Sequence, residues 1–271
     1  MRPFHFIARL GLGAGVLCIA GGCSDSPTDP PADPPFFKPM PVVTWSQLHD
    51  ALGQAQTPAP GSTRNVGGGL QFNMWATVLD RNGVVVAVAF TGATEGDQWP
   101  GSRVISAQKA NTANAFSLPK FALSTANLYA ATQPGGSLFG LQEANPTDPD
   151  VAFGGKTEDY GTPMDFMVGH RIGGTNVFGG GLALYDASGT IIGGLGVSGD
   201  ASCADHNIAW KLRFLLQLDH VPAGVADGGA DDNIIYDITN GVSTSGFGHP
   251  TCSAEMTDSS NALSTRYPIG H

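Results

Sequence analysis

Apolar side chains follow a helical period directly after the proline-rich start of the chain. Between residues 45 and 55 they recur every three or four positions, and Thr44 with Gln47 has the form of a capping box in front of them. Pro58 and Pro60 cannot continue a helix. The pattern therefore predicts a helix over residues 45–56.

Two pairs of β-rich runs predict hairpins. Residues 74–80 and 84–90 flank Asn82-Gly83, which is a strong signal for a tight turn, and residues 172–185 and 190–197 flank a second turn. The run at 84–90 is apolar on both faces, which favours a central position in the sheet.

Two further segments predict helices. Pro100 suits the first turn of a helix that reaches residue 116, and a short helix is expected over 124–129. The most regular pattern begins at Ser202, the expected N-cap, and predicts a helix over 202–218.

The order of these elements predicts the fold class. A helix, a hairpin, helices, a hairpin and a helix in succession are typical of an α+β domain with helices packed on an antiparallel sheet. Residues 133–167 carry scattered Gly, Pro and Asp, and we interpret them as a long insertion or a lid-like loop. We expect a single domain over residues 42–271, since about 230 residues are enough for one buried core.

The N-terminal segment has the features of an export signal. Arg2 and Arg9 accompany an apolar run that is too short to span a bilayer and ends in small residues before Cys23. This end resembles a bacterial lipobox, so we expect cleavage of residues 1–22, lipidation of Cys23 and attachment to the cell envelope, on the outer membrane. The alternative is an ordinary secretory leader in which Cys23 is incidental. Residues 23–41, rich in proline, are then a lipid-anchored spacer.

Composition narrows the choice of partners. The net charge of −10 repels phosphate backbones, which argues against nucleic acid. Hydrophobic residues make up 41% of the chain, so the domain is expected to be ordered despite its 38 glycines. The glycines form no phosphate loop and no dinucleotide-binding motif, and we interpret them as places where backbones approach closely.

Two cysteines remain beyond the leader and the lipidation site, namely Cys203 and Cys252. We predict a disulfide between them, because an isolated pair in an oxidising compartment usually forms a bridge. A metal pair or a nucleophile is the alternative, although a structural zinc site would need two more ligands at close spacing.

Charged and aromatic residues near two predicted helix starts form the candidate ligand site. Spare N–H groups at a helix start favour a carboxylate, so His206 is the candidate for binding iron or a carboxylate, and Asp205 for orienting it. Trp99, Arg103 and Lys109 are the candidates for the opposite wall. The alternatives are that Asp205 only caps the helix, that His206 lies in the core, and that the two cations are solvated.

The stretch GGLALYDASGTIIGGLGVSGDASCADHNIAWKLR, residues 180–213, resembles the GlcG/HbpS family of haem-binding-type proteins. The resemblance rests on Gly180-Gly181, on Gly194, on Gly196-Val197-Ser198-Gly199 and on Asp205, and it covers roughly residues 70–255. It implies a profilin-like domain with a five-stranded antiparallel sheet, assembly into homo-oligomers, and haem as the expected class of cofactor. No axial haem ligand of the family maps onto a residue of this chain.

Three functions agree with these features. The leading one is an envelope-tethered, oligomeric protein that binds haem or another small anionic molecule. The second is an enzyme that acts on a small organic acid or degrades its own bound haem, with Asp205 and His206 as acid–base groups. The third is a structural envelope oligomer whose glycines serve subunit packing.

Overall fold

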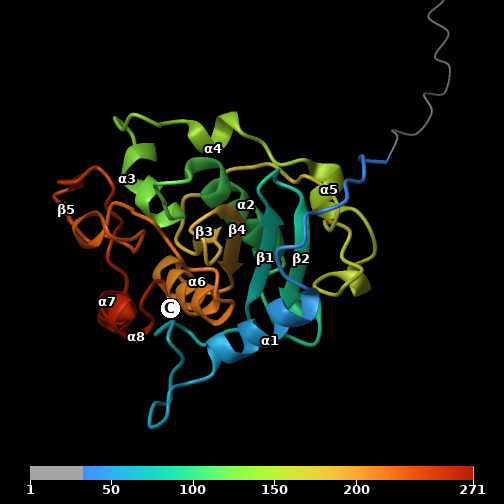
Figure 1. Cartoon of the computed structure of the whole chain (residues 1–271), viewed down its shortest axis with the longest axis horizontal. Helices are drawn as coiled ribbons and strands as arrows, with labels where there is room; N and C mark the ends of the chain where they lie inside the picture. Colours follow the sequence, from blue (N-terminus) through green and yellow to red (C-terminus); the bar gives the residue numbers. More distant parts are fainter. Residues whose placement is uncertain (1–32, 271) are drawn as a thin grey trace, which may run out of the picture. The chain divides into compact units, whose positions relative to one another are not determined.

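Four strands form an antiparallel sheet at the centre of the domain (Figure 1). The computed structural model describes residues 33–270, so the expected signal peptide and Cys23 lie outside the described residues. The strands lie in the order β2-β1-β4-β3, with bounds β1 (Trp75–Asp80), β2 (Val85–Phe90), β3 (Gly181–Tyr185) and β4 (Ile191–Ser198). Both predicted hairpins are confirmed, and the pairing of β1 with β4 joins them.

The predicted five-stranded sheet is not confirmed. Within residues 33–270 the main sheet has four strands, and two short strands, β5 (Ile238–Thr239) and β6 (Val242–Ser243), form a separate ribbon. The strand predicted over 172–185 begins only at Gly181, since Gly173 and Gly174 adopt positive φ angles of 66° and 78° that interrupt an extended run.

The position predicted for β2 was wrong, because β2 is an edge strand. It is apolar on both faces because both are buried: Ala87 and Ala89 pack with residues 48–55, and Val85 and Val88 pack with residues 151–172. Its outer edge is covered as well. Val85 N donates to His170 O at 2.9 Å, and Gly169 N donates to Val85 O at 2.9 Å. The chain at 169–171 thus protects an edge that would otherwise be open.

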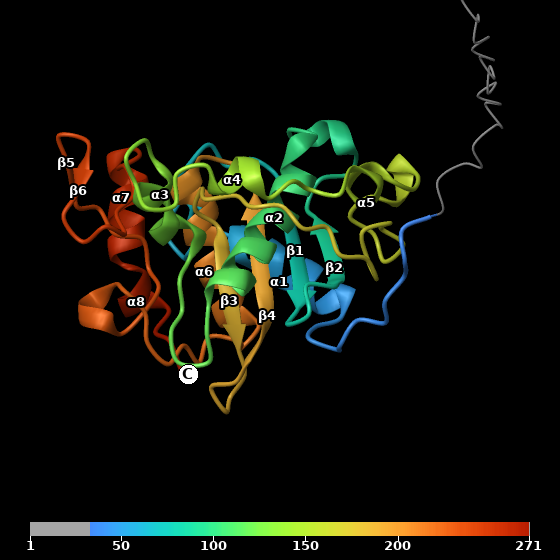
Figure 2. The same cartoon turned by 90° about the horizontal axis from the view of Figure 1, so that it is seen from above.

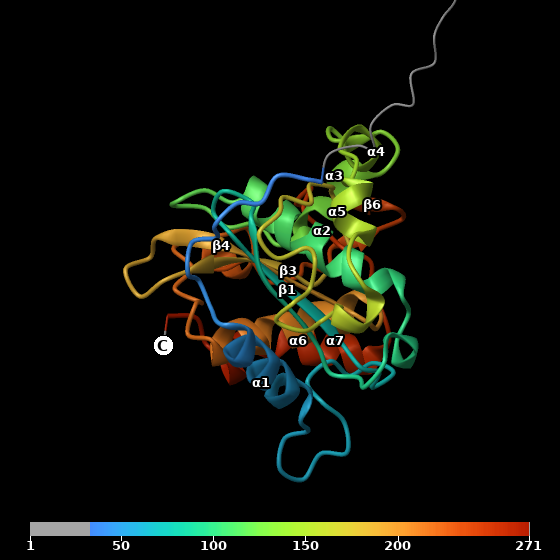
Figure 3. The same ribbon diagram turned by 90° about the vertical axis from the view of Figure 1, so that its right-hand side faces the viewer.

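Helices cover both faces of the sheet. Helix α2 (Gly101–Phe116) packs on one face, and α1 (Trp45–Gln56) and α6 (Ser202–Leu215) pack on the other, as Figure 3 shows. All three were predicted from the sequence, although α6 ends three residues early. Thr44 and Gln47 form the expected capping box of α1.

Shorter elements flank this core. The predicted helix at 124–129 is a 3₁₀ turn, η2 (Thr125–Leu128), continued by α3 (Tyr129–Thr132). Figure 2 shows α3 and the C-terminal elements on the β3 side of the sheet and α5 on the β2 side. The remaining elements are η1 (Glu95–Asp97), α4 (Leu141–Ala144), α5 (Pro149–Phe153), η3 (Thr157–Asp159), η4 (Asp227–Gly229), α7 (Ala254–Asn261) and α8 (Leu263–Arg266).

Two glycines of β4 let α2 lie directly on the sheet. A Cβ atom at Gly196 would overlap the carbonyl oxygen of Ser106, and one at Gly194 would overlap that of Ala110. The interpretation of these glycines as points of close backbone approach is therefore confirmed. The close approach also brings Lys109 to the end of β4, where its Nζ donates to Val197 O at 3.0 Å.

The end of the proline-rich segment lies on the domain. Phe37 N donates to Gly169 O at 2.6 Å, and Met40 N donates to a carboxylate oxygen of Asp80 at 2.9 Å. The guanidinium of Arg171 lies 4.1 Å from the centre of the Phe37 ring. Residues 36–40 thus belong with the domain rather than with a free spacer. None of the helices in residues 33–270 combines the length and the apolar character needed to cross a bilayer.

Candidate functional site

A cleft of about 310 Å³ opens where α2 and α6 begin. Trp99 and Phe178 are 53% and 49% exposed, so two aromatic rings stand at its rim. The cleft combines apolar side chains with hydroxyl and carboxylate groups: Trp99, Ser102, Ile105, Phe178, Ser198, Asp200, Ser202 and Asp205. Apolar walls with a few converging polar groups are typical of small-molecule sites.

A larger hollow of about 660 Å³ lies between residues 129–137 and the β5–β6 ribbon. Its lining carries no charged side chain and no residue of the family-like motif. We place the candidate site in the smaller cleft because titratable groups and exposed aromatic rings meet there.

Asp205 lies at the cleft in a buried ion pair with Lys109. Its Oδ2 is 2.7 Å from Lys109 Nζ, its Oδ1 accepts from Asp200 N at 2.8 Å, and the side chains of the pair are 3% and 1% exposed. Burial raises the pKa of Asp205 to about 7, against the opposing effect of the Lys109 charge. Burial likewise lowers the pKa of Lys109, against the opposing effect of Asp205. The sequence had named both residues, and the structure brings them together.

Gly180 makes the room that this ion pair needs. Its φ of 111° is open to glycine, and a Cβ atom there would lie 3.0 Å from Asp205 Cβ and 3.2 Å from Lys109 Nζ. The helices α2 and α6 lie on opposite faces of the sheet. The space at Gly180 lets the paired side chains of these two helices come into contact beside the first residue of β3. The glycine preceding β3 in the family-like motif serves this contact.

Trp99, which the sequence suggested for the wall opposite Asp205, lines the same cleft as Asp205. Its ring meets that of Phe72 edge to face, with centroids 5.4 Å apart, and Phe72 is itself 40% exposed. The Phe72 ring packs against Trp99 without lining the cleft, and both rings are accessible to solvent.

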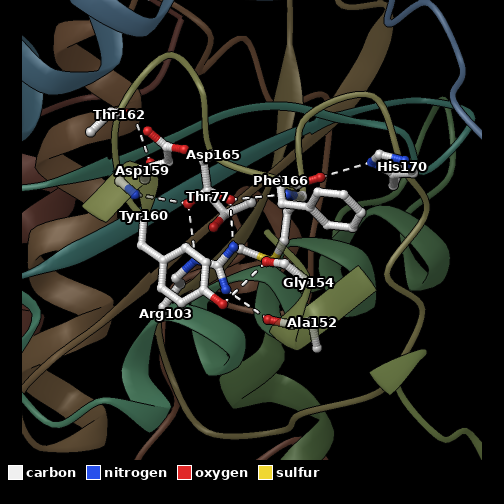
Figure 4. Close-up of polar contacts among 12 residues, drawn as sticks. Thr77, Arg103, Ala152, Gly154, Asp159, Tyr160, Thr162, Asp165, Phe166 and His170 are labelled. Carbon is white, nitrogen blue, oxygen red and sulfur yellow. Dashed lines mark hydrogen bonds and ion pairs between the residues drawn. The ribbon is translucent and has the colours of Figure 1, made fainter. Parts of the chain in front are cut away.

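Arg103 does not reach the cleft, and its assignment to a ligand wall needs correction. Its Nε and Nη2 bind the Asp165 carboxylate at 2.9 and 2.5 Å, its Nη1 donates to Ala152 O at 2.7 Å, and the Tyr160 ring lies over it at 3.6 Å (Figure 4). The side chain is 3% exposed. Arg103 therefore anchors the 149–165 segment, which the sequence left as an insertion, to α2.

His206 lies in the core, with none of its surface exposed. Its Nε2 is 3.2 Å from Asn233 Oδ1, and burial lowers its pKa to about 4. Successive residues of a helix point about 100° apart, so Asp205 faces Lys109 and the cleft while His206 is turned to the side, toward Asn233. Direct ligation of iron by His206 in the cleft does not fit this packing.

The start of α6 differs from the prediction, which placed the N-cap at Ser202. Ala201 is the N-cap, Ser202 is the first helical residue, and Asp205 accepts from Asp200 rather than from the N-cap. Cys203 and Cys252 form the predicted disulfide, with an S–S distance of 2.02 Å. The bridge fixes the 249–252 segment to the first turn of α6.

Several cleft residues were not predicted. Ile105 and Phe178 carry no chemical signal in the sequence, since each reads as an ordinary apolar residue. Ser202 was assigned to a cap, and Ser198 was noted only as part of the Gly-Val-Ser-Gly block, which could have indicated it. Within residues 33–270 no group of three or more His, Cys, Asp or Glu side chains is placed to hold a metal ion.

Comparison with known proteins gives one family match. Residues 63–212 match the family model described as haem-degrading protein, HbpS-like. A search of curated proteins finds no match.

Similar solved structures include a PduOC–haem complex, the Klebsiella pneumoniae protein ORFY and HbpS. A crystal structure of a PduOC–haem complex has 23% identity and a TM-score of 0.41, covering 63% of this chain and 89% of the other. The Klebsiella pneumoniae protein ORFY has 20% identity and a TM-score of 0.43, with 68% and 95% covered. HbpS has 18% identity and a TM-score of 0.37, with 63% and 86% covered. With TM-scores this low, the family assignment rests on the sequence match.

Proposed function

The chain belongs to the HbpS-like family of haem-degrading proteins, and on that basis we propose that it binds haem in the cleft where α2 and α6 begin. The observation that carries the proposal is the pair of exposed rings, Trp99 and Phe178, on a cleft whose polar side includes Ser198 and Asp205 of the family-like motif.

The residues of the cleft fit the porphyrin ring. Trp99, Phe178 and Ile105 offer apolar surface, and aromatic rings favour offset or edge-to-face contact with another flat ring. A volume of about 310 Å³ lies at the small end of ligand sites, so part of the macrocycle would stay in solvent. The Asp200 carboxylate disfavours another carboxylate beside it, whereas Asp205 is paired with Lys109.

The polar side chains that line the cleft offer only oxygen atoms as ligands for a haem iron. Haem iron is held in proteins by His, Cys, Met or Tyr, and none of these lines the cleft within the described residues. Binding would thus rest on ring contacts, and we expect micromolar rather than tight affinity. Bound haem supplies redox chemistry at its iron. The contribution of this chain would be to hold the ring and to exclude water from its buried edge.

The environment of Asp205 favours a second function, that of an enzyme that degrades its own haem. A carboxyl group with a pKa near 7 is poised to give or take a proton at neutral pH. Decay of the Soret band of bound haem under air with a reductant, faster for wild type than for Asp205→Asn, would support this reading.

A haemin titration tests the binding proposal. Absorbance near the Soret band is followed for wild type, Trp99→Ala and Phe139→Ala; the Phe139 ring is 65% exposed and does not line the cleft. We expect Trp99→Ala to weaken binding about tenfold, which corresponds to about 1.4 kcal/mol of ring contact, and Phe139→Ala to bind as wild type does. Equal affinity in all three proteins would place haem elsewhere. Absence of any spectral change at tens of micromolar haemin would refute haem binding itself.

We further propose that the protein is a homo-oligomer tethered to the cell envelope through Cys23. The lipobox-like end of the leader supports the tether, and the family resemblance supports assembly. Light scattering after size-exclusion chromatography, which measures the mass of the particle against the 27.9 kDa of one chain, tests the oligomer.

A further inference from the structure

Ser202 and His249 are joined side chain to side chain beside the cleft. Ser202 Oγ lies 2.8 Å from His249 Nε2. On the other side of the imidazole, Nδ1 lies 2.7 Å from the carbonyl oxygen of Pro250. A carbonyl oxygen can only accept, so Nδ1 carries the proton and Nε2 is left to accept from the Ser202 hydroxyl.

One covalent bond and one close backbone contact hold this pair of side chains in place. The disulfide joins Cys203, directly after Ser202, to Cys252, three residues after His249. Gly179 lies against the start of α6, where a Cβ atom would come within 2.5 Å of Ser202 O. Its N–H donates to Ser202 Oγ at 2.7 Å and thereby fixes the hydroxyl from a second direction.

The imidazole is kept neutral. His249 is 3% exposed, and burial lowers its pKa to about 4. Its ring lies 5.1 Å from that of Tyr129, which covers it on one side. At neutral pH the Nε2 lone pair is therefore available to the Ser202 hydroxyl, and the low pKa makes the imidazole a weak base, which slows proton transfer from Ser202.

Ser202 also faces the cleft, since it is partly exposed and belongs to the cleft lining. As the first residue of α6 it begins a helical turn whose N–H groups have no acceptor within the helix. Such groups can stabilise an oxyanion that forms next to Oγ. A nucleophile, a base, a group that orients the base, and oxyanion donors are thus present together.

We propose that Ser202 and His249 are the nucleophile and general base of an acyl-transfer site that hydrolyses neutral carboxylic esters in this cleft. Asp200 disfavours anionic substrates, and the exposed rings of Trp99 and Phe178 suit an aromatic or aliphatic acyl group. The proposal goes beyond haem binding and does not depend on it.

The reaction balances with water as the only co-reactant. Ser202 Oγ bonds to the ester carbonyl carbon while its proton passes to His249 Nε2 and the carbonyl π electrons move to oxygen. The bond to the alcohol oxygen then breaks, and the proton on Nε2 goes to the departing alcohol. Water attacks the acyl-serine, its proton passes to Nε2 and then to Ser202 Oγ, and the carboxylic acid leaves.

The orienting group predicts a slow enzyme. A carbonyl oxygen stands where serine hydrolases carry a carboxylate, so the imidazolium that forms gains less stabilisation. We expect turnover below the usual range of about 1–10³ s⁻¹. Covalent labelling of the serine is therefore a more sensitive readout than steady-state hydrolysis.

The test uses the full chain with its disulfide intact, a fluorophosphonate probe and p-nitrophenyl butyrate. We expect one probe adduct per chain, mapped to Ser202 by mass spectrometry, and ester hydrolysis that falls at least a hundredfold in Ser202→Ala. His249→Gln should lose labelling as well. Ser137→Ala, which changes an exposed serine outside the cleft, should behave as wild type.

Each result has a defined meaning. Failure of wild type to be labelled at Ser202 under saturating probe would overturn the proposal, as would hydrolysis that persists in Ser202→Ala. If His249→Gln does not fold by circular dichroism, labelling of wild type at Ser202 alone decides the assignment of the nucleophile. The haemin affinity of Ser202→Ala is measured in parallel. This measurement distinguishes failure of the ester-hydrolysis proposal from failure of the haem-binding proposal.

Discussion

Lys109 Nζ lies 2.7 Å from Asp205 Oδ2, and this pair connects two helices that pack on opposite faces of the sheet. The side chains are 1% and 3% exposed, so the charges compensate each other rather than being solvated. Asp205 also borders the cleft. The ion pair is therefore both a core contact and one side of the candidate site.

Lys109→Met should be strongly destabilising because it leaves the Asp205 carboxylate buried without its cationic partner. We expect a loss of about 3–5 kcal/mol in the free energy of unfolding at pH 8. Without Lys109 the pKa of Asp205 rises further, so the folded protein takes up a proton that the unfolded chain releases above about pH 4. The loss should thus be smaller at pH 5 than at pH 8. Urea unfolding at both pH values measures it, with the exposed Lys120→Met as control.

The double variant Lys109→Met/Asp205→Asn separates charge from packing. Because it removes both charges, we expect it to recover part of the stability that Lys109→Met loses. A double variant no more stable than Lys109→Met would show that shape, and not the unpaired carboxylate, causes the loss.

Arg103→Met should loosen the 149–165 segment without changing the cleft. Asp165 would lose both hydrogen bonds from the guanidinium group, and Ala152 O would lose the one that it accepts from the same group. Limited proteolysis is expected to cut this segment several times faster than in wild type, whereas haemin affinity stays unchanged. Arg266→Met, at an exposed position, is the control. A selective loss of haemin affinity would restore the ligand role that the sequence suggested for Arg103.

Removal of the disulfide should lower stability and weaken the Ser202–His249 contact together. The bridge spans 49 residues, for which the chain-entropy estimate is about 4 kcal/mol. Chemical unfolding of Cys203→Ala/Cys252→Ala measures the loss, and fluorophosphonate labelling of the folded variant reports on the contact. Unchanged labelling would mean that Gly179 and the packing around His249 hold the pair without the bridge.

Cys23→Ala should abolish lipidation. Wild type is expected to enter the detergent phase on partitioning and to incorporate labelled fatty acid, since dual acylation gives stable anchoring. The variant should lose both properties. A wild-type protein that stays in the aqueous phase without acyl groups would support the ordinary secretory leader instead.

Local elements of the fold could be predicted, whereas elements that depend on distant contacts could not. The helix at 45–56 carries its own cap and apolar stripe, and the first hairpin carries its own turn. Helices α7 and α8 have weak patterns and are held by distant bonds, such as Asn207 Nδ2 to Met256 O at 3.0 Å and Trp210 Nε1 to Tyr267 O at 2.9 Å. The edge position of β2 depends on residues 169–171, which no local pattern places beside it.

The same distinction applies to the site. Asp205, Lys109 and Trp99 could be named from residue type and helix position. The pairing of Asp205 with Lys109 could not, because the two residues are 96 positions apart in the chain. Arg103 was misassigned because its partner, Asp165, lies in a segment without periodicity. The contact of Ser202 with His249 was implicit in the predicted disulfide, which forces residues 202 and 249 into one neighbourhood.

Gly194 and Gly196 in β4 have a bearing on how this protein can evolve. A methyl group at either position would have to lift α2 from the sheet, and Ser102, Ile105 and Lys109 would move with the helix. The depth of the cleft thus depends on the absence of a side chain at these two positions of the sheet. Substitutions at these two glycines are therefore restricted by the shape of the cleft, although neither glycine lines it.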